Sequence, residues 1–225
     1  MIRQVISTAD GSKTLFLPEM NEQYHSLNGA ITESEYVYIE KGYQFHPAPF
    51  PKIFEVGFGT GLNALLTALQ AIKNQRKTTF YTIEKYPLED HTIRELNYGQ
   101  LISQEAQELF EKLHSCSWNE KVEISPYFSL QKILNDILVS SLKEIEKCDI
   151  IYFDAFGPDK QSEMWTPVIL KKIFNLGSSG SVFVTYSAKG EIRRQLATLG
   201  FQMERLPGPP GKKQMLRGIK KNSIL

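Results

Sequence analysis

Apolar residues along this chain occur in short continuous runs that alternate with stretches of helical periodicity. The runs predict strands at 52–56, 77–83, 122–124, 149–153 and 181–186. The periodic stretches predict helices at 62–74, 87–99, 101–113, 130–145, 167–177 and 191–199. Two further strands, 201–206 and 214–218, form a hairpin near the end of the chain. Strands that alternate with helices indicate an α/β fold, with a parallel sheet covered by helices on both faces.

The first 46 residues do not follow this pattern. Residues 3–8 and 13–17 flank an Asp10-Gly11 turn and predict a β-hairpin, whereas residues 36–39 fit either a strand or a short helix. Three prolines between positions 47 and 51 make the next segment stiff. We therefore expect a small β-rich cap over residues 1–46, followed by one main domain over residues 47–225.

The middle of the chain contains a glycine-rich turn between a predicted strand and a predicted helix. The segment reads Glu55-Val-Gly57-Phe-Gly59-Thr-Gly61-Leu-Asn63. A dinucleotide fingerprint would need its third glycine at position 62, and a phosphate-binding P-loop would need a lysine directly after its last glycine; neither is present. Strand, turn and helix in this order bring backbone N–H groups close to a nucleotide-like ligand. The alternative is an incidental glycine-rich turn.

Two carboxylates follow predicted strands. Glu84 ends the second strand of the main domain, where a carboxylate can accept hydrogen bonds from both ribose hydroxyls; the alternative is a surface salt bridge. Asp154 ends the fourth strand, at the sheet edge where open α/β proteins place their chemistry. After the third predicted strand, residues 125–130 contain no carboxylate.

Composition restricts the class of protein further. The 225 residues are 41% hydrophobic and 23% charged, as in soluble globular domains. No apolar stretch is long enough to span a bilayer, and the N-terminus lacks the apolar segment of a signal peptide. The two cysteines, Cys116 and Cys148, and the four dispersed histidines lack metal-ligand spacing. We therefore expect a cytoplasmic protein without a metal site and without a membrane partner.

Positive charge gathers toward the C-terminal end. From Lys189 onward there are nine lysines and arginines against two glutamates, a net charge of +7, whereas the preceding residues carry −6. This asymmetry predicts that the C-terminal part meets a polyanion. The alternative is a solvated basic surface that binds nothing.

The glycine turn resembles that of class I S-adenosylmethionine-dependent methyltransferases. Further motifs are Tyr24-His25-Ser26, Glu84-Lys85-Tyr86-Pro87, residues 154–158 with 164–166, residues 185–188 and residues 211–218. In this order and combination, the motifs resemble those of the methyltransferase domain of the MnmC family of bacterial tRNA-modifying enzymes. The resemblance implies a Rossmann-like sheet that is mostly parallel with an antiparallel last strand. It also implies S-adenosylmethionine as cofactor, bound by Glu55, Gly57, Gly59, Gly61, Asn63, Glu84, Lys85 and Asp154.

In that family the methyl group passes to the amine of 5-aminomethyl-(2-thio)uridine at the wobble position of tRNA and gives the methylaminomethyl nucleoside. Bifunctional members also carry an FAD-dependent oxidoreductase domain, for which 225 residues leave no room. We therefore expect this chain to methylate only and to depend on a separate enzyme that forms the aminomethyl group. The family's aspartate after the third strand aligns with Leu130 here, which leaves the adenine contact unassigned.

The reaction requires a neutral amine that a carboxylate can orient and deprotonate. We assign this role to Asp154. The alternative is that Asp154 only contacts the methionine end of the cofactor or caps a turn. Candidates for stacking on an extruded base are Phe156, Trp165 and Tyr186. Candidates for phosphate contacts are Lys189, Arg193, Lys212, Lys213 and Arg217. The alternatives are a methyltransferase that acts on a small-molecule or protein amine, a non-catalytic S-adenosylmethionine-binding module and, against the glycine spacing, a nicotinamide dehydrogenase.

Overall fold

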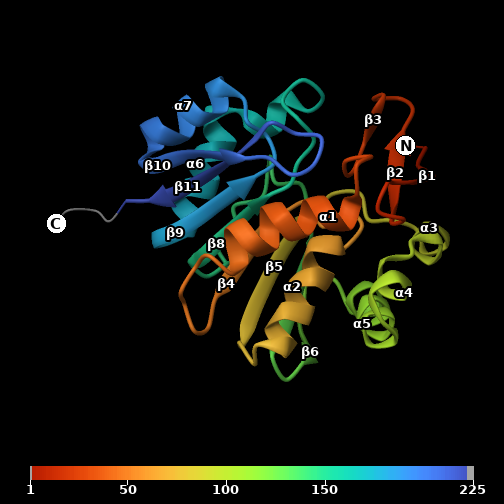
Figure 1. Cartoon of the computed structure of the whole chain (residues 1–225). Helices are drawn as coiled ribbons and strands as arrows, with labels where there is room; N and C mark the ends of the chain where they lie inside the picture. Colours follow the sequence, from red (N-terminus) through yellow and green to blue (C-terminus); the bar gives the residue numbers. More distant parts are fainter. Residues whose placement is uncertain (1, 222–225) are drawn as a thin grey trace.

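The structure is a computed structural model that describes residues 2–221. An eight-stranded sheet forms its centre, in the order β10-β11-β9-β8-β4-β5-β7-β6 (Figure 1). The parallel strands of its middle are β4 (Lys52–Val56), β5 (Thr78–Glu84), β7 (Phe128–Leu134), β8 (Cys148–Phe153) and β9 (Gly177–Thr185).

At one side of the sheet, β11 (Gln214–Lys220) runs antiparallel to both β9 and β10 (Phe201–Pro207). At the other edge, β6 (Lys121–Ser125) runs antiparallel to β7. The predicted sheet, mostly parallel with an antiparallel last strand, is therefore confirmed.

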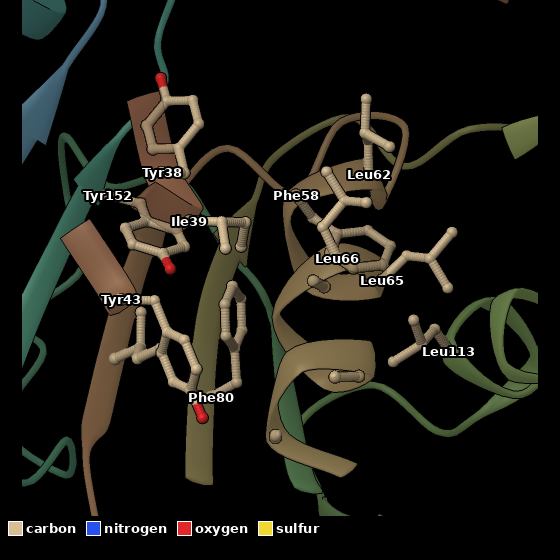
Figure 2. Packing of buried hydrophobic residues seen from close by; sticks show 14 of the residues in the cluster. Tyr38, Ile39, Tyr43, Phe58, Leu62, Leu65, Leu66, Phe80, Leu113 and Tyr152 are labelled. Atoms are coloured by element: carbon tan, nitrogen blue, oxygen red, sulfur yellow. The ribbon is translucent and has the colours of Figure 1, made fainter. Parts of the chain in front are cut away.

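Helices cover both faces of this sheet. On one face, α2 (Leu62–Lys73) and α5 (Gln104–Ser115) pack with Phe80 and its neighbours in the larger of two buried clusters (Figure 2). On the other face, α6 (Pro167–Leu176) and α7 (Gly190–Leu199) enclose the second cluster. Because successive strand residues point to opposite faces, each central strand contributes side chains to both clusters.

The N-terminal segment combines a small sheet with a helix. The predicted hairpin is present as β1 (Gln4–Ser7) and β2 (Lys13–Leu17), and β3 (Glu22–Gln23) extends it to three strands. The chain then forms α1 (Ala30–Ser34), which continues directly as a π-helix, η1 (Glu35–Tyr43). Residues 36–39 are therefore helical, and this helix packs against the main sheet (Figure 1).

The prediction of a helix at 130–145 was wrong, because residues 128–134 form β7, the third parallel strand. Phe128, Leu130 and Lys132 are buried on alternate positions, as in a strand. The buried polar side chain of Lys132 hides this alternation from a hydrophobicity pattern; its Nζ donates to the carbonyl of His114 over 2.7 Å. The weak strand at 122–124 is the edge strand β6.

The segment after Pro87 also differs from the prediction. Instead of one helix from Pro87 to Gly99, two short helices form, α3 (Asp90–Glu95) and α4 (Tyr98–Ile102). Across residues 2–221, no helix is both long and apolar enough to cross a membrane.

Candidate active site

A pocket opens at the carboxyl ends of β4, β5, β7 and β8, the edge at which open α/β sheets bind ligands. The glycine turn forms its floor, and the segments that follow β5, β7 and β8 form its walls. The N-terminal segment closes another side with Arg3, Met20, Tyr24 and His25. Both parts of the chain therefore build the site.

The glycine turn requires its glycines for two reasons. Gly57, Gly59 and Gly61 have φ angles of 89°, 51° and 73°, in the left-handed region that disfavours other residues. A Cβ atom at Gly61 would also lie 2.8 Å from Nε2 of His114. Burial lowers the pKa of His114 to about 4, so that its ring is neutral and Nε2 donates to the carbonyl of Thr60 over 3.1 Å. His114 on α5 therefore holds the glycine turn through the carbonyl of Thr60.

Glu84 stands beside this turn at the end of β5. Its Oε2 accepts a 3.0 Å hydrogen bond from the backbone N–H of Gly59, and its Oε1 accepts a 2.8 Å bond from that of Tyr86. These bonds fix the carboxylate on the pocket wall and leave lone pairs for a ligand. A carboxylate held in this way can still accept hydrogen bonds from hydroxyl groups.

A carboxylate does follow the third parallel strand, contrary to the sequence-based prediction. Asp136 comes two residues after β7 and lines the pocket with Asn135 and Ile137. Its Oδ1 accepts from the backbone N–H of Leu138 over 2.8 Å, and its Oδ2 lies 2.9 Å from Nζ of Lys85. Burial would raise the pKa of Asp136, but these two donors outweigh burial and lower it.

Asp154 lies across the pocket, at the end of β8. Its Oδ1 accepts a 2.6 Å hydrogen bond from the hydroxyl of Tyr38, and its Oδ2 accepts a 2.8 Å bond from Nδ2 of Asn63. Burial raises the pKa of Asp154 to about 6, although both hydrogen bonds lower it. The site thus holds a carboxylate that is mostly ionised at neutral pH but takes up a proton readily.

Glu55 does not line this pocket. It is 1% exposed, and its Oε2 accepts a 2.8 Å hydrogen bond from the hydroxyl of Thr82 on the neighbouring strand. Burial raises the pKa of Glu55 well above its usual value. The sequence assigned Glu55 to the cofactor, but its side chain is not part of the pocket lining.

The three aromatic candidates lie in different environments. Phe156 and Tyr186 line the pocket, and the hydroxyl of Tyr186 donates to the carbonyl of Ala155 over 2.9 Å. Trp165, in the short 3₁₀-helix η2 (Ser162–Trp165), is 3% exposed in the core beside Phe153. Its Nε1 donates to the carbonyl of Phe156 over 2.7 Å, so Trp165 helps to position Phe156. Because the Trp165 ring is buried, it does not offer a stacking surface of its own.

Most of the expected phosphate-binding cations are already paired. Lys189 forms an ion pair with Asp159, Lys212 with Glu33 and Arg217 with Glu204. Lys213 is exposed, and Arg193 is half-buried at the start of α7. Three of the five candidate cations are therefore paired with carboxylates of this chain, two of which, Glu33 and Asp159, lie outside the C-terminal part.

Several pocket residues were not identified from the sequence. Arg3 donates to the carbonyl of Tyr86 over 2.7 Å and to the hydroxyl of Tyr24 over 3.2 Å, which fastens the N-terminal sheet to the segment after Glu84. His25 is buried, which lowers its pKa to about 4. The motif Tyr24-His25-Ser26 signalled this region, but only the folded chain brings it to the glycine turn.

The pocket fits S-adenosylmethionine, whose ammonium, ribose hydroxyls and adenine amino group all donate hydrogen bonds. Oδ1 of Asn63 is buried on the pocket wall and has no partner among the described residues. The carboxylates of Glu84, Asp136 and Asp154 add acceptors around the same cavity. Within residues 2–221, no three His, Cys, Asp or Glu side chains are grouped as metal ligands would be.

Comparison with known proteins agrees with this fold. The family model of S-adenosyl-L-methionine-dependent methyltransferases matches residues 99–221. The chain therefore belongs to the S-adenosyl-L-methionine-dependent methyltransferases, and S-adenosylmethionine is its cofactor.

Individual relatives identify the type more closely. One relative is the tRNA 5-methylaminomethyl-2-thiouridine biosynthesis bifunctional protein MnmC of Actinobacillus pleuropneumoniae serotype 5b. Its sequence is 27% identical to this chain, over 90% of this chain and 33% of the relative. The Pseudoalteromonas atlantica protein of that name is 30% identical over 94% of this chain and 32% of its own length. This chain thus spans about a third of the length of these curated relatives.

Solved structures give the same result. MnmC2 from Aquifex aeolicus superposes with a TM-score of 0.81 at 27% identity, covering 99% of this chain and 71% of that structure. Spermidine synthase from Thermotoga maritima, at 11% identity and a TM-score of 0.56 over 99% of this chain and 74% of that one, shares the fold alone. The expected resemblance to the methyltransferase domain of MnmC is confirmed.

Proposed function

We propose that this chain methylates the amine of 5-aminomethyl-(2-thio)uridine at the wobble position of tRNA, giving 5-methylaminomethyl-(2-thio)uridine. The names of the MnmC relatives support this substrate. The observation that carries the reaction type is the position of Asp154, which faces the same pocket as the glycine turn and is held by two hydrogen bonds.

The cofactor residues that we propose surround the pocket floor. Gly57, Gly59 and Gly61 let the backbone approach the ligand, Asn63 accepts from its ammonium and Glu84 accepts from the ribose. We assign the adenine amino group to Asp136, whose carboxylate Lys85 orients.

When bound, S-adenosylmethionine supplies an electrophilic methyl group on a sulfonium. A substrate amine would have to be neutral to accept this methyl group, because a protonated amine has no free lone pair. The carboxylate of Asp154 accepts a hydrogen bond from the amine, orients it and takes the proton that it loses. The aromatic walls formed by Phe156 and Tyr186 exclude water and offer faces for an extruded base.

In this proposal, the part of the tRNA that remains outside the pocket contacts the loop between β10 and β11 and the start of α7. Among the five candidates we propose Lys213 and Arg193 for phosphate contacts, because Lys189, Lys212 and Arg217 are ion-paired within the chain. We further propose that residues 1–46 act as a cap on the methyltransferase domain of residues 47–225, since Met20, Tyr24 and His25 line the pocket.

The substrate amine has to be made beforehand. An enzyme that forms the aminomethyl group on the wobble uridine is therefore the functional partner that we propose.

Methyl incorporation tests this function. Bulk tRNA from cells that lack the protein is incubated with the chain and radiolabelled S-adenosylmethionine, then digested to nucleosides. We expect label in 5-methylaminomethyl-2-thiouridine, and far slower labelling with Asp154→Asn. If the cofactor binds but no nucleoside is labelled, the protein is a methyltransferase of another amine or a non-catalytic binding module.

A further inference from the structure

A hydrogen bond from the N-terminal helix reaches the carboxylate at the centre of the site. The hydroxyl of Tyr38 donates to Oδ1 of Asp154 over 2.6 Å, and Tyr38 is 1% exposed. The two residues are 116 positions apart. With Asn63 on Oδ2, each carboxylate oxygen has one protein donor and keeps its remaining lone pairs for other contacts.

The local backbone explains how Tyr38 reaches this position. In the π-helix η1, residues five apart lie close to one face; Tyr38 and Tyr43 both point into the core between the helix and the sheet (Figure 2). At Gly42 the helix comes so close to the sheet that a Cβ atom would lie 3.1 Å from both Tyr152 and Val184. The wide helix turn and the glycine together bring the hydroxyl of Tyr38 to the end of β8.

The other charged groups around Asp154 partly oppose one another. Glu33, from the same helix, disfavours the ionised form of Asp154, whereas Lys212, from the loop between β10 and β11, favours it. Glu55 on β4 and Tyr186 after β9 also interact electrostatically with Asp154. The direct donors that favour the ionised carboxylate are thus Tyr38 and Asn63.

We propose that Tyr38 is a positioning residue that orients Oδ1 of Asp154 and stabilises the ionised form of this carboxylate for the methyl transfer. This inference rests on the proposed function, because it gives Asp154 the task of orienting and deprotonating the amine. The proposal gives the N-terminal helix η1, which contains Tyr38, a role in the reaction as well as in the fold.

The sign of the effect follows from the hydrogen bond. Tyr38→Phe removes a donor to the carboxylate, so the pKa of Asp154 rises further above its ordinary value. A larger fraction of the variant is then protonated and inactive at low pH, whereas at high pH Asp154 is ionised in both proteins. Loss of activity should therefore be greatest at acidic pH and recover as the pH rises.

The test measures kcat/KM for methyl transfer at several pH values between 5.5 and 9, and takes the ratio of Tyr38→Phe to the wild-type chain at each. The ratio cancels the titration of the substrate amine, which both proteins share. We expect a ratio about tenfold lower at pH 5.5 than at pH 9. Tyr43→Phe is the matched control: Tyr43 lies on the same helix, is buried and bonds Thr78 instead, so its ratio should not change with pH.

A ratio for Tyr38→Phe that is constant across this range overturns the proposal, whatever its value. If Tyr38→Phe does not fold, 3-fluorotyrosine at position 38 replaces it. Its more acidic hydroxyl is a stronger donor, so the acid limb of the profile should move to lower pH; an unmoved limb overturns the proposal. An inactive wild-type chain that still binds S-adenosylmethionine contradicts the proposed function instead, so the two failures are distinguishable.

Discussion

Glu33 and Lys212 form an ion pair across 179 positions of the chain. The pair joins the N-terminal helix to the loop between β10 and β11. The other oxygen of Glu33 accepts from the backbone N–H of Ser26 over 3.1 Å, and Nζ of Lys212 lies 3.9 Å from the centre of the Tyr186 ring. Lys212 therefore supports the pocket wall instead of standing free for a phosphate.

The first prediction concerns this pair. Lys212→Met leaves the carboxylate of Glu33, whose side chain is 6% exposed, without its counter-charge. We expect a loss of about 1–3 kcal/mol in the free energy of unfolding, since Lys212 itself is partly solvated. The double variant Glu33→Gln with Lys212→Met should recover most of it. Urea unfolding of Lys212→Met, Glu33→Gln and the double variant measures the coupling free energy between the two residues. If the two single losses of stability simply add in the double variant, the pair is not a stabilising unit.

A second prediction separates Lys213 from its neighbour. Lys213 is exposed on the same loop, so Lys213→Ala should weaken tRNA binding and reduce the slope of log affinity against log salt by about 1. Lys77→Ala is the control, because Lys77 precedes β5 and lies at the opposite edge of the sheet from the pocket. Equal slopes for the wild-type chain and Lys213→Ala would remove this residue from the RNA contacts.

The third prediction concerns the carboxylate at the end of β8. Asp154→Asn preserves the shape of the side chain but cannot accept the amine proton, so the rate of methyl transfer should fall roughly 10²–10⁴-fold. S-adenosylmethionine binding, measured by calorimetry, should change far less. Asp159→Asn on the same segment is the control and should keep its activity. A parallel loss of binding and rate would make Asp154 a cofactor ligand only.

Asp136 yields a fourth prediction. Asp136→Ala should weaken S-adenosylmethionine binding about tenfold by removing an acceptor for the adenine amino group. An analogue with oxygen in place of that amino group should bind the wild-type chain more weakly, and the variant should no longer distinguish the two ligands. Glu144→Gln, exposed and outside the pocket, serves as control. Continued discrimination by Asp136→Ala would place the adenine elsewhere.

The fifth prediction uses the turn of the N-terminal hairpin. Burial opposes ionisation of Asp10, but donors from Ser12, Thr32 and Thr8 outweigh it and lower its pKa to about 2. Because the folded-state pKa is below the ordinary value of 3.8, the stabilisation is present above pH 4 and is lost as the pH falls toward 2.

The stability difference between the wild-type chain and Asp10→Asn, from urea unfolding, should therefore shrink between pH 5 and pH 2.5. Glu95→Gln, exposed on α3, provides the comparison. A difference that does not depend on pH would contradict the role of the Asp10 charge.

The sequence alone predicted the parts of the site that depend on local signals. The glycine turn identifies itself because only glycine adopts its left-handed angles without strain, and an apolar run before it marks β4. Glu84 and Asp154 follow equally clear strands, so their common position at one edge of the sheet follows from parallel pairing.

Only the tertiary structure decided the rest. Lys132 breaks the hydrophobic alternation of β7, so the strand was predicted as a helix and Asp136 was not recognised as the carboxylate at its end. The bonds from Tyr38 to Asp154 and from Lys212 to Glu33 join residues more than a hundred positions apart. Periodicity and spacing report a residue's neighbours along the chain, whereas the partners and charge state of a buried side chain depend on the segments that folding packs against it.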